Sequence, residues 1–388
     1  MNKYSVVSFK FYSNKYYLNK IIKKGIKYIT RQNIITSPYL QNDTYYICKY
    51  NENEFKNNKD INNIHNQPVS PWHELNLISD KSFINIINIL KSQEITQNLK
   101  LNKLIELSKK LNISNNDAEI NYTTLLIEYL LENNFNKDNN NNITDKIYNE
   151  LKFNSVIEIP KDTCAKFEVN KSIYKNPIMQ DNKWTKNGCN YSRFNKLNYI
   201  VHYGMLPLTW ETNKISIIND GINSYKGDDD PLDMIEISNS QYYIGDVIQV
   251  DILGAICLID QNEADWKIIT ISSEYLNKNN LKTEDITTYI SNYINKNSNL
   301  DFAKLNIDFK LDNLIHSLTY YKTYEGKTKN KFHLTEGYIK NNEIKNNNQN
   351  IDIKKYFFNK EKAIKVIFES YCHYINNKEY LINRMKKI

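Results

Sequence analysis

The most constraining feature of this sequence is a series of short β-branched segments between residues 153 and 271. Each segment is bounded by Gly, Pro, Asn or Asp, which are the residues that end strands and form turns. Many short strands with a few peripheral helices favour a small closed β-barrel over a doubly wound parallel sheet. The expected strands are Val156–Ile159, Ala165–Val169, Leu232–Ile237, Asp246–Leu253, Ala255–Ile259 and Lys267–Ile271.

Two parts of the chain have helical instead of β periodicity. Apolar residues between 81 and 134 recur at helical spacing, which predicts three helices ahead of the Asn-rich stretch 136–142. We interpret residues 79–148 as a helical insertion that packs locally. The second periodic part, Lys360–Tyr374, predicts a helix with Ala363, Val366, Ile367 and Tyr371 on one face.

Positive charge is concentrated at the N-terminus. The formal net charge is +7, but residues 1–27 contain seven lysines and no acidic residue. The rest of the chain is close to neutral, so we expect no nucleic-acid-binding face. No apolar run approaches the roughly 18 residues that cross a bilayer, so we expect a soluble protein with no membrane insertion.

The acid-free start resembles an organelle transit peptide, because it is rich in Lys, Ser and Tyr and lacks the uninterrupted apolar stretch of a secretory signal. We expect residues 1–28 to be a targeting leader that directs the chain to the mitochondrial matrix. The alternatives are a plastid leader, or a disordered basic tail on a cytoplasmic protein.

The residues that carry chemistry are acidic. No GxGxxG, GxxxxGK[ST], GxSxG or HExxH motif occurs, which excludes the sites that those patterns mark. Instead, Gly227–Asp233 (GDDDPLD) and Asp260–Lys267 (DQNEADWK) each lie at the edge of an expected strand. Carboxylates without His or Cys select hard cations such as Mg²⁺ or Mn²⁺ over zinc.

The order of residues in the first cluster predicts the directions of its side chains. In an extended backbone Asp228 and Asp230 point the same way and Asp229 points the opposite way. Asp233 joins the first two only if Pro231 kinks the run. Alone, this cluster is more often a solvated turn than a metal site. The second cluster favours a metal site for an anionic substrate, because charges beside buried strands are costly unless paired or bound to metal.

The whole ordered set of motifs resembles the family I soluble inorganic pyrophosphatases in their eukaryotic form. The strongest match is DDDPLD followed by GDVIQVDILGAICLIDQNEADWKIITI. Further similar segments are ITRQ, TYYICKY, QPVSPWHELNL, FNSVIEIP, AKFEV, NPIMQD, YIVHYGMLPLTWE, YYKTYEGKTKNKF and the closing helix. The resemblance implies a five-stranded OB-like barrel with flanking helices, mainly β, that hydrolyses pyrophosphate with several Mg²⁺ ions per site, for which Mn²⁺ is a possible substitute.

Carried over position by position, the resemblance also implies residue roles. Asp230 would be the catalytic base that orients and deprotonates the attacking water. Glu158 and Tyr199 would support the pocket. The implied metal ligands are Asp228, Asp233, Asp260, Asp265 and Glu168, and the implied substrate contacts are Lys166, Arg193, Tyr203, Lys267, Tyr321 and Lys322.

The chain departs from the family pattern at two places that bear on function. Asp229 stands where the family has Asn or Ser, which adds a negative charge. Lys161 and Asp162 stand where eukaryotic members often carry Arg-Trp at their dimer contact, which leaves a homodimer in doubt. Two alternatives stay open: a hydrolase of other phosphoanhydrides such as polyphosphate or nucleotides, and a pyrophosphatase-like structural or assembly subunit.

The basic leader, the helical periodicity and the resemblance together give the domain organisation that we expect. It comprises a leader at 1–28, a pyrophosphatase domain of 29–78 plus 149–378, the helical insertion 79–148 within it, a C-terminal tail at 379–388, and polar insertions at 276–308 and 339–354.

Overall fold

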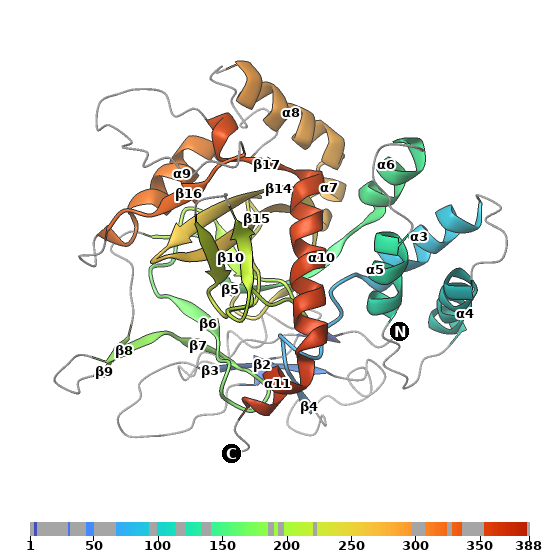
Figure 1. Cartoon of the computed structure of the whole chain (residues 1–388), viewed down its shortest axis with the longest axis horizontal. Helices are drawn as coiled ribbons and strands as arrows, with labels where there is room; N and C mark the ends of the chain where they lie inside the picture. The colour runs from blue at the N-terminus through green and yellow to red at the C-terminus, as the bar shows by residue number, and fades with distance from the viewer. Residues whose placement is uncertain are drawn as a thin grey trace.

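Figure 1 shows the computed structural model of the chain, in which five strands form a closed ring. The structure describes residues 4–5, 30–31, 44–49, 67–92, 99–113, 122–132, 141–184, 190–192, 198–219, 223–296, 307–323, 328–335 and 353–385. In the ring, β13 and β15 run parallel and every other neighbouring pair is antiparallel. Its strands, in hydrogen-bonded order, are β5 (Phe153–Ile159), β10 (His202–Met205), β13 (Asp233–Glu236), β15 (Glu263–Ser272) and β14 (Val247–Asp260). The predicted five-stranded barrel is confirmed.

Strands β14 and β15 are buried along almost their whole length, because both of their faces are covered. Successive side chains of a strand point to opposite faces. In β14, Ala255 and Cys257 belong to the core shared with α10 (Lys360–Asn376). Ile256 and Leu258 belong to the core beneath α7 (Ser273–Lys278), α8 (Thr283–Lys296) and α9 (Leu311–Tyr320). This arrangement explains why the sequence of these strands is continuously apolar instead of alternating.

The sequence predicts two strands where the structure has only β14. The register between β14 and β15 shifts between Ile252 and Gly254, which is a β-bulge inside a single strand. A Cβ on Gly254 would lie 2.3 Å from the Phe357 ring and 2.4 Å from the Phe358 carbonyl oxygen. The glycine that looked like a strand end therefore allows a close approach of the chain beside it.

Helices surround the barrel. Helix α10 (Lys360–Asn376) packs on β14, and its buried face confirms the prediction for this segment. Figure 1 shows the helical insertion on the far side of α10 from the barrel, where Thr124 and Tyr371 share a 2.6 Å hydrogen bond. The other helices near the barrel are α7 (Ser273–Lys278), α8 (Thr283–Lys296), α9 (Leu311–Tyr320), η4 (Ile353–Lys355) and α11 (Lys378–Asn383).

The helical insertion contains a fourth helix that the sequence analysis missed. The described helices there are α3 (Asp80–Lys91), α4 (Leu99–Ile113), α5 (Tyr122–Glu132) and α6 (Asn141–Glu150). Helix α6 begins inside the Asn-rich run, because Thr144 and Ile147 give it a buried face. The Asn85 amide donates to Glu150 at 2.7 Å and ties α6 to α3. A polar composition concealed a helix that tertiary packing stabilises.

Shorter strands complete the described structure. One sheet joins β1 (Tyr4–Ser5), β2 (Thr30–Arg31), β3 (Thr44–Lys49), β4 (Gln67–Val69), β6 (Phe167–Val169) and β7 (Ile178–Gln180). The remaining strands are β8 (Asn182–Trp184), β9 (Asn190–Ser192), β11 (Ser216–Asn219), β12 (Ser224–Gly227), β16 (Lys331–His333) and β17 (Phe358–Asn359).

Of the predicted leader, only residues 4–5 are described, and most of the predicted insertion 339–354 lies outside the described residues. The predicted insertion 276–308 contains α8, on which Ile286 and Ile290 are buried. Among the described residues, no helix combines the length and apolar character needed to cross a membrane.

Candidate active site

The acidic loop between β12 and β13 directs its aspartates to two different places. Asp228, Asp230 and Asp233 line one cavity, whereas Asp229 does not. The loop is a turn, not the extended segment that the sequence suggested: the Asp230 amide donates to the Asp228 carboxylate at 3.0 Å, and Asp229 has a φ of 72°. The expected pairing of Asp228 with Asp230 therefore holds, but a left-handed residue between them produces it.

Asp229 is held on the far side of the loop. Arg384 donates to both of its carboxylate oxygens at 2.9 and 2.8 Å, and the Trp210 indole donates to it at 3.0 Å. Partial burial acts to raise the pKa of Asp229, but Arg384 and Lys171 outweigh it and leave the pKa below its usual range. Arg384 and the buried Leu381 show that the predicted C-terminal tail is packed, in its described part, against this loop.

The second acidic cluster surrounds the hairpin between β14 and β15. Gln261 and Asn262 both have positive φ, which is typical of the tight turn that joins two antiparallel strands. Asp260 ends β14, and Asp265 lies two residues into β15 with only 4% of its surface exposed. The hairpin thus delivers both carboxylates to the same cavity.

Strand register joins the two clusters. Lys267 lies opposite Asp233 in the parallel pairing of β13 with β15, and its ammonium group contacts the carboxylates of both Asp233 and Asp265. The Tyr203 hydroxyl donates to Asp233 at 2.5 Å. A buried lysine shared by two aspartates is therefore the centre of the site.

Burial shifts the protonation of several carboxylates in the cavity. Desolvation is the largest cause of the rise in the pKa of Asp233 to about 6, against the opposing effect of Lys267. Desolvation and then the neighbouring Asp230 raise the pKa of Asp228 well above its usual range. The pKa values of Glu158 and Glu168 are also raised, mainly by burial. Carboxylates outnumber lysines in the cavity lining, and a bound cation would favour their ionised forms.

The basic residues lie on the same cavity and are paired with acids. Lys166 contacts Glu168 at 2.5 Å and Asp181 at 3.5 Å, and Lys322 contacts Asp260. The cavity has a volume of about 480 Å³. Arg193 lies outside the described residues. All thirteen other residues predicted from the sequence line the cavity: Glu158, Lys166, Glu168, Tyr199, Tyr203, Asp228, Asp230, Asp233, Asp260, Asp265, Lys267, Tyr321 and Lys322.

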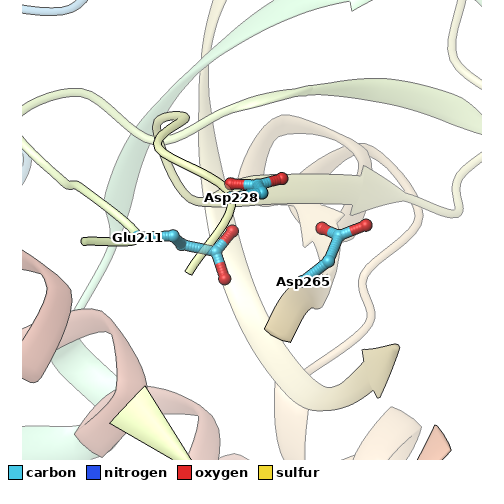
Figure 2. Close-up of side chains that lie close together, drawn as sticks. All are labelled: Glu211, Asp228 and Asp265. Carbon is cyan, nitrogen blue, oxygen red and sulfur yellow. The ribbon is translucent and has the colours of Figure 1, made fainter. Parts of the chain in front are cut away.

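The sequence analysis missed two charged residues at the site. Lys171 lies 2.5 Å from the Asp230 carboxylate and also donates to the Asp229 carbonyl oxygen at 3.1 Å. Glu211 is completely buried, and Figure 2 shows its carboxylate beside those of Asp228 and Asp265. The sequence feature that could have identified Glu211 is its position as a single acid directly after the mostly apolar run that ends at Trp210. A charge buried at such a position is costly unless it is paired or bound to a cation.

The donor set fits a hard divalent cation. One carboxylate oxygen from each of Glu211, Asp228 and Asp265 lies within 4.8 Å of the others, and no His or Cys belongs to this group. One oxygen of the buried Glu211 has no hydrogen-bond partner among the described residues. Oxygen-only ligands are those preferred by Mg²⁺ and Mn²⁺.

Comparisons with known proteins find similar sequences in one family. The sequence model of the inorganic pyrophosphatase family matches residues 155–350. An inorganic pyrophosphatase of Eremothecium gossypii is 45% identical over 121 residues, which are 31% of this chain and 40% of that protein. The mouse protein named inorganic pyrophosphatase 2, mitochondrial, is 37% identical over 180 residues, 46% of this chain and 49% of its own. The matched segments thus span half or less of these relatives.

A solved structure shows the same fold. The crystal structure of a type I inorganic pyrophosphatase from Toxoplasma gondii superposes with a TM-score of 0.50 and 19% sequence identity. The superposition covers 90% of this chain and 99% of that one. The closed ring of strands with flanking helices is therefore the fold of that protein as well.

Proposed function

Because the chain belongs to the family I soluble inorganic pyrophosphatases, we propose that it hydrolyses inorganic pyrophosphate to two phosphate ions, with Mg²⁺ as its cofactor. The observation that supports this proposal most is the cavity that gathers seven carboxylates of the predicted set together with three lysines. Pyrophosphate carries up to four negative charges, so a site for it needs cations from the protein and from metal.

The pairing of acids with lysines fits this substrate. Lys166, Lys267 and Lys322 each contact a carboxylate assigned to metal binding. When metal neutralises the carboxylates, the ammonium groups are free to contact the phosphate oxygens. The bound metal ions and the lysines together would then balance the negative charges of the carboxylates and of pyrophosphate.

The reaction is the attack of water on one phosphorus with departure of the other phosphate: P₂O₇⁴⁻ plus H₂O gives two HPO₄²⁻. Bound Mg²⁺ would lower the pKa of water and offset charge on the phosphates. Asp230 accepts the proton of the attacking water, and its 44% exposed side chain lets water reach it. Tyr203 and Tyr321 have pKa values above the ordinary range, chiefly through burial, so they remain hydroxyl donors toward phosphate oxygens.

The assignments in this pocket are tested by phosphate release from pyrophosphate by the full chain, with Mg²⁺ and with EDTA. We expect turnover that needs Mg²⁺, with Mn²⁺ able to replace it. No turnover together with a stoichiometric bound partner would instead favour a structural or assembly subunit.

A second candidate is the hydrolysis of other phosphoanhydrides. The cavity of about 480 Å³ extends beyond the acids to apolar residues just before β10 and on α9, including Val201, Leu314 and Leu318. This extent favours substrates longer than pyrophosphate. The phosphate-release assay with tripolyphosphate and with ATP distinguishes the two candidates. A rate with either compound that equals the rate with pyrophosphate would make hydrolysis of other phosphoanhydrides the main activity.

For location and assembly we propose import into mitochondria through residues 1–28, and a homodimer. Residues 1–40 fused to a fluorescent protein should label mitochondria, and diffuse, plastid or secretory fluorescence would contradict this. Light scattering on the purified chain should give twice the mass of 46.0 kDa, and a single mass would exclude the dimer.

A further inference from the structure

Glu211 is a buried carboxylate that is only half satisfied. None of its surface is exposed. Its Oε1 accepts a hydrogen bond of 2.9 Å from the Trp266 amide, whereas its Oε2 has no partner among the described residues. A buried acid in this state is unfavourable unless a proton or a cation compensates it.

The Glu211 carboxylate lies beside those of two aspartates. Figure 2 shows the Glu211, Asp228 and Asp265 carboxylates converging from three separate segments, with ligand oxygens within 4.8 Å of one another. Oxygens on opposite sides of one Mg²⁺ are about 4.2 Å apart, because each bond is about 2.1 Å long. Small side-chain rotations therefore let the three carboxylates share an ion.

The positive groups of the described chain are used elsewhere. Lys267 contacts Asp265 and Asp233, and Lys171 contacts Asp230 and Asp229. Within the described residues, no lysine or arginine forms an ion pair with Glu211 or Asp228. These two acids lack a protein counter-ion where the aspartates beside them have one.

The backbone holds Glu211 firmly against the acidic loop. Its amide donates to the Asp230 carbonyl oxygen, and its carbonyl oxygen accepts from the Asp229 amide, both at 2.9 Å. A Cβ on Gly227 would lie 2.3 Å from the Glu211 carbonyl carbon, so only glycine permits this approach. The loop that carries Asp228 is thus built around Glu211.

We propose that Glu211 is a ligand of the divalent cation held by Asp228 and Asp265. The inference rests on the proposed function, since both need a cation in this cavity. It adds a fourth carboxylate-bearing segment to the site, which the motif residues alone do not include.

Cation binding without substrate tests the role of Glu211. Mn²⁺ is titrated into the full chain and free Mn²⁺ is followed by electron paramagnetic resonance, alongside the rise in Tm on Mn²⁺ addition. Glu211→Gln keeps the shape and the acceptor for the Trp266 amide but removes the charge. We expect its tightest Mn²⁺ site to weaken about tenfold or more, the usual scale for perturbing a metal's environment, with a smaller rise in Tm.

Glu236→Gln is a matched control. Glu236 is also completely buried with one unpartnered oxygen, but its other oxygen accepts from the Ser238 and Ser272 amides away from the cavity. The Mn²⁺ affinity of the Glu236→Gln variant should stay within about twofold of that of the wild type. If Glu211→Gln does not fold, Glu211→Asp replaces it, and its shorter side chain should weaken Mn²⁺ binding about threefold or more.

The outcomes separate this inference from the proposed function. The inference is overturned if the folded Glu211→Gln variant binds Mn²⁺ as tightly as the wild type. It is also overturned if Glu211→Gln and Glu236→Gln lose Mn²⁺ affinity equally. Either result would make Glu211 a protonated structural residue. A wild-type chain that binds no Mn²⁺ would contradict the proposed function and the inference together.

Discussion

Strands β13 and β14 each carry a buried carboxylate toward one end of the barrel and a half-buried one at the other, and the two pairs have different surroundings. At the cavity end, Asp233 shares Lys267 with Asp265, and Asp260 contacts Lys322. At the opposite end, Asp251 is 1% exposed and contacts Lys152, the Ser273 hydroxyl at 2.6 Å and the Thr283 hydroxyl at 2.5 Å. Nearby, one Glu236 oxygen accepts from two backbone amides at 3.0 Å.

The difference shows how a structural carboxylate can be told from a functional one. At the opposite end, local donors satisfy most of the acid oxygens, so the fold itself explains the charges there. At the cavity end, carboxylates outnumber lysines, which is the pattern expected of a functional site. Mutations at the two ends should therefore affect different properties: activity at one, stability at the other.

The largest effect is expected at the cavity end, where Asp230→Asn removes the proposed base. Turnover of pyrophosphate at saturating Mg²⁺ should fall by about 10² or more, the scale of general-base loss. The control is Asp229→Asn, which carries the same charge change one residue away but outside the cavity, and it should change turnover by less than about fivefold. Initial rates are compared after circular dichroism confirms folding. Equal losses in the two variants would remove the basis for the assignment.

The next largest effect is on the pH dependence of stability, through Glu236 at the end of the barrel opposite the cavity. Burial is the main cause that raises the pKa of Glu236 to about 7 from 4.5. Glu236 binds its proton more tightly in the folded chain than in the unfolded chain. Its contribution to the free energy of unfolding is therefore fully present below pH 4.5 and is lost as pH rises through about 7. The loss amounts to at most about 3 kcal/mol.

Urea unfolding of the wild type and Glu236→Gln measures this contribution. The free energy of unfolding of the wild type should fall relative to the variant between pH 4.5 and 7.5. Parallel curves for the two proteins would show that Glu236 does not titrate in that range.

A third comparison uses the two ends of β14. Asp251→Asn should lower the free energy of unfolding by about 2 kcal/mol, because it removes the carboxylate charge that pairs with Lys152, while turnover per folded molecule stays within about twofold. Asp260→Asn should have the opposite pattern: turnover per folded molecule should fall clearly, while the free energy of unfolding should change little. Urea titrations and initial rates on both variants provide the test. If Asp251→Asn reduces turnover as much as Asp260→Asn, the two ends do not have separate roles.

The smallest effect on activity is expected from the helical insertion. Replacing residues 80–147 with a short Gly/Ser linker should keep pyrophosphate hydrolysis within roughly tenfold, about 1.4 kcal/mol of barrier. The flanking chain allows this change, since Ile78 and Phe153 already form an antiparallel bridge. The rate is measured on the folded fraction. Complete loss of activity in a folded protein would mean that the insertion contributes to the cavity.

The sequence alone determined the barrel and most of the cavity. Short β-branched segments fix strands because their periodicity is local, and the ordered motifs placed thirteen of the fourteen proposed site residues where the structure brings them together. The fourteenth, Arg193, lies outside the described residues. Even the opposite directions of Asp229 and Asp230 followed from chain order, although a turn and not an extended strand produces them.

Only the tertiary structure decided what depends on distant segments. The Asn-rich start of α6 looks like a loop until α3 covers its apolar face. Arg384 meets Asp229 across 155 residues of sequence, and Glu211 meets the Trp266 amide across 55. Burial and ion pairing depend on which segments become neighbours in space, and a local sequence pattern carries no record of those neighbours.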